Sequence, residues 1–130
     1  MDSSRLGELP GLLRTLADDL TTLPDPATLP RVGNWRVEWD KAADTLMLSA
    51  QLYPAYGTGD LGEIAEVNQW ATALGGGLRL GKENASAGFF WRQLAAVADL
   101  PGGLRIEIWT HLEYHLPTGA VTAAARLLAA

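Results

Sequence analysis

The chain has 130 residues, of which 48% are apolar and none is cysteine, and ten basic against fifteen acidic side chains give a formal net charge of -5. That length and apolar content suit one compact domain and exclude a disordered chain. The absence of cysteine excludes disulfides, thiolate zinc sites, iron–sulfur clusters and cysteine nucleophiles. We therefore expect an acidic protein whose stability comes from an apolar core.

Several classes of function have no support in the sequence. No apolar run reaches the roughly 18 residues of a membrane-spanning helix, and the first residues, Met1-Asp2-Ser3-Ser4, lack the pattern of a signal peptide. We expect a cytoplasmic protein that does not bind membranes. The basic residues are scattered singly among acidic ones, which argues against nucleic-acid binding because phosphates need clustered cations. The triple glycine Gly75-Gly76-Gly77 follows a predicted helix, whereas a phosphate-binding loop precedes one, so we expect no cofactor.

The first 30 residues predict a helix followed by a linker. Five leucines recur at steps that place them on one side of an amphipathic helix. They are Leu9, Leu12, Leu13, Leu16 and Leu20. Prolines at 24, 26 and 30 then oppose both helix and sheet, so this stretch is expected to be extended. We interpret residues 1–30 as an N-terminal helix with a Pro-rich linker, and residues 31–130 as a single α+β domain.

The next segments predict a β-hairpin. Residues 35–40 alternate, which places Trp35, Val37 and Trp39 on one face, and both tryptophans are expected to fill the core. Residues 45–53 alternate as well, and the polar loop between the two runs is short enough for a hairpin.

A helix is expected to start at Asp60, because Asp60 and Glu63 have the spacing of a capping box. The triple glycine that follows supplies the left-handed exit that ends such a helix. Residues 78–80 are a short strand candidate, and residues 81–88 are expected to form a loop or an irregular edge.

The second half of the chain contains the strongest strand signal. Residues 104–114 alternate regularly between apolar and polar side chains. Residues 89–100 fit either a helix or a strand, and we favour the strand because residues 101–103, Pro-Gly-Gly, form a turn and the following strand needs a paired neighbour. Residues 118–130, rich in Ala and Leu, predict a closing helix. Strands in runs separated by one helix indicate the α+β class. We expect an antiparallel sheet of about five strands, with an N-terminal helix, a C-terminal helix and helices packed on one face.

Two stretches carry a resemblance. Residues 70–76, Trp-Ala-Thr-Ala-Leu-Gly-Gly, and residues 104–112, Leu-Arg-Ile-Glu-Ile-Trp-Thr-His-Leu, resemble a pattern in small uncharacterised proteins of actinobacteria and their phages. In those proteins a helix that ends in Trp-Ala-x-Ala-Leu-Gly precedes a hairpin closed by a Val-Trp-Thr-like strand. The resemblance covers roughly residues 35–112, implies a strand at residues 89–100, and brings no activity with it.

The polar side of the last strand is the candidate functional surface. Arg105, Trp109, His111 and Glu113 would project together from it, and an exposed tryptophan there would suit a protein interface. The alternative for Trp109 is burial beneath a covering helix. We expect a protein partner or a homodimer at this face, or at a free sheet edge that pairs with another strand.

No catalytic constellation is present, because the chain has no Gly-x-Ser-x-Gly motif and only two histidines. The favoured hypothesis is a non-catalytic protein-interaction module, such as an accessory or inhibitory factor of a phage or mobile element. A second hypothesis is a metal-dependent enzyme or metal-binding protein using His111, Glu113 and His115, although strand spacing separates such ligands too widely for one ion without a bend. A third is a small-ligand pocket lined by Trp and Leu.

Overall fold

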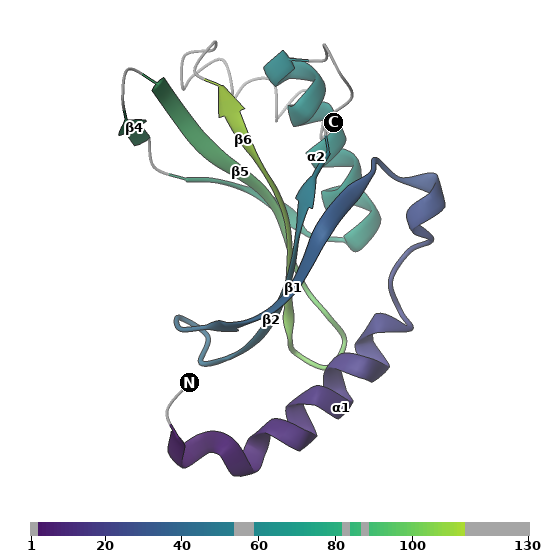
Figure 1. Ribbon diagram of the computed structural model, residues 1–130. Helices are drawn as coiled ribbons and strands as arrows, with labels where there is room; N and C mark the ends of the chain where they lie inside the picture. The colour runs from purple at the N-terminus through teal and green to yellow at the C-terminus, as the bar shows by residue number, and fades with distance from the viewer. Residues whose placement is uncertain (1–2, 54–58, 82–83, 87–88, 114–130) are drawn as a thin grey trace.

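The computed structural model describes residues 3–53, 59–81, 84–86 and 89–113. In this part of the chain two α-helices and six strands form an α+β structure (Figure 1). The elements are two 3-10 helices, η1 (Ser3–Glu8) and η2 (Pro26–Thr28), the helices α1 (Leu9–Leu20) and α2 (Gly59–Leu74), and the strands β1 (Val32–Asp40), β2 (Thr45–Leu52), β3 (Gly77–Leu80), β4 (Asn84–Ser86), β5 (Phe89–Asp99) and β6 (Arg105–Glu113). None of these helices has the length and apolar character that crossing a membrane requires.

The sheet is mixed. Its strand order is β1-β2-β6-β5-β3, with β4 pairing to β5 beyond the end of β3. All pairs are antiparallel except β2 and β6, which run parallel with Leu48 opposite Ile106. The prediction of a purely antiparallel sheet is therefore wrong. The physical reason is that α2 carries the chain from β2 across one face of the sheet to its far edge, so that β6 returns to the centre in the same direction as β2.

The two hairpins are confirmed. β1 and β2 pair from Val32 with Leu52 to Asp40 with Thr45. Residues 89–99 form a strand, as predicted. The whole length of β6 pairs with residues 91–99 of this strand. The β5–β6 turn at residues 101–103 includes Gly103 at a φ of 89°, a conformation that a side chain disfavours.

The core lies between the sheet and the helices. α2 packs against β5 and β6, and Figure 1 shows it along one face of the sheet while α1 crosses below, next to the end of the β1–β2 hairpin. The fully buried large side chains are Trp70, Leu52, Ile64, Leu94, Ile106, Ile108 and Val67. α1 is present as predicted and adds Leu16 to the same core. Glu63 is buried, and its Oε1 accepts a hydrogen bond of 2.7 Å from Thr110 Oγ1, which links α2 to β6.

The predicted C-terminal helix at residues 118–130 lies outside the described residues. The division between residues 1–30 and 31–130 stays a prediction.

Candidate functional site

The polar side of β6 faces away from α2, as the alternation predicted. Ile106, Ile108 and Thr110 point to the helix-covered face, so Arg105, Trp109 and His111 lie on the opposite face. Trp109 is half-buried, and its ring centroid lies 5.0 Å from that of the exposed His111. Trp109 is thus neither fully buried nor fully exposed, and no described helix covers it.

The charges on this face are balanced within the chain. The Arg105 guanidinium lies 3.9 Å from a carboxylate oxygen of Asp40 and 3.6 Å from one of Asp99. Partial burial lowers the pKa of His111 from its ordinary value of 6.5, because it disfavours the charged imidazolium. His111 is therefore largely neutral at pH 7, and its ring is tilted against the indole of Trp109.

The metal hypothesis gains no ligand set from the described residues. Glu113 is the last residue of β6, opposite Trp91 in β5, and His115 lies outside the described residues. Among the residues that the structure places, no three His, Asp or Glu side chains gather closely enough to hold an ion. A site at His111, Glu113 and His115 stays a prediction.

A second surface is formed by the edge strand β1, which among the described strands pairs only with β2. A bulge interrupts β1, because Gly33 lies opposite Gln51 and Arg36 opposite Ser49, leaving two residues of β1 opposite Ala50. Asn34, at a φ of 53°, accommodates the extra residue. The bulge shifts the alternation so that Val32 and Val37 lie on the same, helix-covered side of the sheet.

Most of the exposed large apolar side chains belong to η1, α1 and β1, which meet where Arg5 lies over Trp39 and where Leu20 and Trp35 border one pocket. Of the seven large apolar side chains exposed in the described part of the chain, five lie in these three elements, and we call them the α1–β1 surface. They are Leu6 (56% exposed), Leu13 (46%), Leu20 (44%), Trp35 (45%) and Val37 (49%). The expectation that Trp35 fills the core is wrong, because β1 is at the edge of the sheet with none of the described strands outside it, whereas Trp39 is half-buried.

Two sets of contacts hold α1 in place. At its start, the Arg5 guanidinium lies 5.0 Å from the centre of the Trp39 ring and pairs with Asp44 and Glu8. The hydrogen bond to Glu8 raises the pKa of Arg5. At its end, the buried Asp19 accepts a hydrogen bond of 2.7 Å from the Gly102 N–H in the β5–β6 turn.

Close packing at the same turn requires glycine. A Cβ at Gly102 would lie 2.3 Å from Thr15 Cγ2 and within 3 Å of both carboxylate oxygens of Asp19. One flank of α1 is thus pressed against the β5–β6 turn. Leu13 and Leu20 lie on the other flank, since seven residues bring a helix back to nearly the same side.

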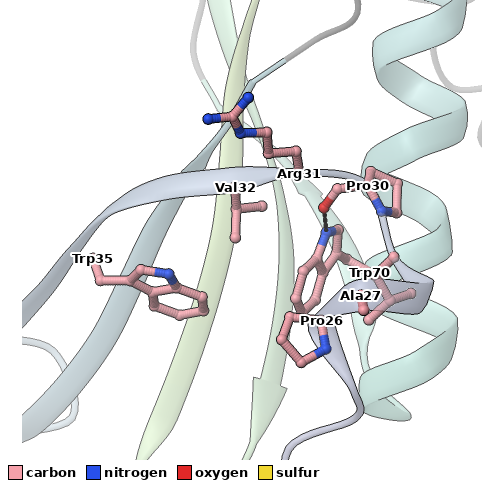
Figure 2. Close-up of a pocket in the computed structure, with 8 residues that line it drawn as sticks. Pro26, Ala27, Pro30, Arg31, Val32, Trp35 and Trp70 are labelled. Carbon is pink, nitrogen blue, oxygen red and sulfur yellow. Dashed lines mark hydrogen bonds between the residues drawn. The ribbon is translucent and has the colours of Figure 1, made fainter.

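A pocket lies beside Trp35, at one end of the α1–β1 surface. It has a volume of about 370 Å³ and is bordered by Trp35, Trp70 and the segment from Pro26 to Val32. Figure 2 shows the Trp35 ring reaching toward Pro26 and Trp70, and the Trp70 indole N–H donates a hydrogen bond of 2.8 Å to the Pro30 carbonyl. An adjoining pocket of about 250 Å³ extends past Trp35 to Leu20.

The chain matches no protein-family model, and neither a curated protein nor a solved structure shows significant similarity to it. The resemblance to small actinobacterial and phage proteins stays a prediction.

Proposed function

We propose that the protein is a non-catalytic protein-interaction module that binds its partner through the α1–β1 surface. The observation that carries the proposal is the concentration of half-exposed Leu, Trp and Val side chains along one helix and the neighbouring edge strand. Monomeric proteins rarely expose a contiguous apolar patch of this kind unless it is used for binding. An edge strand adds main-chain donors and acceptors that a partner strand can pair with.

The α1–β1 surface supports this function better than the polar side of β6. On β6, Arg105 is engaged by Asp40 and Asp99, and Trp109 is half-buried. Both side chains are less exposed than those of the α1–β1 surface. The set Arg105, Trp109, His111 and Glu113 is therefore the secondary candidate for a protein contact, with Trp109 as its anchor.

A site-specific photocrosslinker tests the proposal. Benzoylphenylalanine replaces Trp35 in one variant and Leu61, which is 59% exposed on α2, in a control variant. Each is irradiated in the cells that encode the chain. We expect a discrete crosslinked species from position 35 that Val37→Lys abolishes, and none from position 61. Equal labelling at both positions, or none at position 35, would refute the proposal.

The pocket beside Trp35 favours a second candidate function, the binding of a small apolar ligand. Its walls are two prolines, one alanine, one leucine, one valine, two indoles and Arg31, and a few hundred cubic ångströms is the size of a small-molecule site. The fluorescent dye 8-anilinonaphthalene-1-sulfonate is a suitable probe. Saturable one-to-one binding that Trp35→Ala removes and Leu61→Ala leaves intact would support this function, whereas equal binding by all three proteins would exclude it.

We further propose that the module acts as an accessory or inhibitory factor of a phage or mobile element. The resemblance of residues 70–76 and 104–112 to small actinobacterial and phage proteins supports the association with a phage or mobile element, and it brings no activity with it. Genes for a defence or secretion system beside the gene for this chain would support it, and a purely metabolic neighbourhood would count against it.

A further inference from the structure

We infer that the partner at the α1–β1 surface is a second copy of this chain, bound by a two-fold axis that pairs β1 with β1 and α1 with α1. The inference rests on the proposed function, because it names the partner of the same surface. A two-fold interface requires a surface that complements itself. Three features of the α1–β1 surface meet that requirement.

The first feature is the direction of the main-chain groups of β1. The Tyr53 N–H donates a hydrogen bond of 2.9 Å to the Arg31 carbonyl. The N–H and C=O groups of successive residues point to opposite sides of a strand. In β2 the groups that point toward β1 are therefore those of Gln51, Ser49 and Met47, and the groups that point toward β6 are those of Ala50 and Leu48. Val37 lies opposite Leu48. Its N–H and C=O therefore point to the outer edge of β1, which no described strand occupies and where a second strand can pair with them.

The second feature is charge. An antiparallel pair of β1 strands centred on Val37 places Arg36 of each copy opposite Glu38 of the other, at the distance of directly opposed side chains. Within the chain, these two residues lie opposite the uncharged Ser49 and Met47. Centring the pair on Arg36 or on Glu38 instead would place like charges opposite each other. The charges therefore select the register centred on Val37, which also sets Trp35 opposite Trp39.

The third feature is the spacing of the exposed leucines. Leu6 and Leu20 are each seven residues from Leu13, so two antiparallel copies of this helical segment would place Leu13 against Leu13 and Leu6 against Leu20. α1 and β1 run in opposite directions, because Arg5 lies over Trp39 and Leu20 borders the same pocket as Trp35. In the proposed dimer the middle of residues 5–20 lies near Val37, so that a single axis serves both pairs.

Light scattering and sedimentation equilibrium on the purified chain measure the association. We expect a species of twice the 13.9 kDa chain mass. Val37→Lys should weaken dimerisation at least tenfold, because two ammonium groups would meet at the axis, and Leu61→Lys should not. Arg36→Glu and Glu38→Arg should each weaken the dimer, and the double variant should restore it. Because these side chains lie at or near the surface, circular dichroism should report the same fold in every variant.

Cysteine crosslinking tests the register independently, since the chain has no native cysteine. Leu13→Cys and Val37→Cys should each form a disulfide-linked dimer on mild oxidation. Leu6→Cys should crosslink efficiently only when mixed with Leu20→Cys, and Leu61→Cys should not crosslink.

A monomer at all accessible concentrations, a dimer that Val37→Lys leaves intact, or a failed charge exchange would overturn the inference. A monomer whose position 35 crosslinks to a different protein would overturn the inference alone and leave the proposed function standing. A monomer that also gives no crosslink from position 35 would overturn both the inference and the proposed function.

Discussion

The docking of α1 on the β5–β6 turn makes a quantitative prediction for Asp19. Asp19 is 3% exposed and accepts a 2.7 Å hydrogen bond from the Gly102 N–H, whereas the adjacent Asp18 is exposed. Asp18→Ala and Asp19→Ala remove the same charge from the same helix end, and both gain about 0.5 kcal/mol from the higher helix propensity of alanine. The difference between the two variants therefore isolates the contact with Gly102.

A hydrogen bond to a charged group contributes about 1.5–3 kcal/mol. The second carboxylate oxygen of Asp19 is buried without a hydrogen-bond partner among the described residues, which places the expected difference at the lower end of that range. We expect Asp19→Ala to be about 1.5 kcal/mol less stable than Asp18→Ala in urea unfolding, or about 5 °C lower in Tm for a chain of this size. Asp19→Asn keeps an acceptor oxygen and should fall between them. Equal stability of Asp18→Ala and Asp19→Ala would show that the contact does not hold α1.

Three further substitutions test other contacts. Thr110→Val keeps the side-chain volume but removes the hydrogen bond to the buried Glu63, so the free energy of unfolding should drop by about 1.5–3 kcal/mol in urea titration; an unchanged midpoint would contradict this geometry. Trp70→Phe leaves the Pro30 carbonyl without its donor and opens space in the core, so calorimetry should show a loss of about 2 kcal/mol or more, and full stability would exclude the contact. Because the pKa of His111 is lowered on folding, the unfolded chain binds more protons just below pH 6.5, and stability should fall as the pH drops through that window. His111→Asn should therefore lose less stability than the native chain between pH 7.5 and pH 5, and an identical loss would be inconsistent with a lowered pKa.

Local patterns predicted most of the strands. The alternation in residues 104–114 places Ile106 and Ile108 in the core, where both are fully buried. The Pro-Gly-Gly turn at residues 101–103 was sufficient to favour a strand over a helix for residues 89–100, because a tight turn after one strand commonly joins it to another. These signals act between neighbours in the sequence, and a period of two residues is visible without knowledge of the partner strand.

The features that sequence reasoning missed depend on contacts between distant segments. Nothing in residues 45–52 or 105–113 distinguishes a parallel from an antiparallel neighbour, because both strands are apolar on the covered face in either case. Trp35 has the alternation of a core residue, and only the position of β1 at the edge of the sheet exposes it. In the sequence, the candidate surface at α1 and β1 was thus indicated only by the amphipathic pattern of residues 9–20 and by the expectation that a free sheet edge could pair with another strand.

The parallel ladder between β2 and β6 divides the sheet into two parts that are made at different times. Leu48 and Ile106, which lie opposite each other, are 58 positions apart in the chain. During synthesis the β1–β2 hairpin must therefore wait, with its inner border unpaired, until almost all of the described chain has been translated. If translation stops before residue 105, both edges of that hairpin remain unpaired. Such fragments should be prone to aggregate or to bind chaperones.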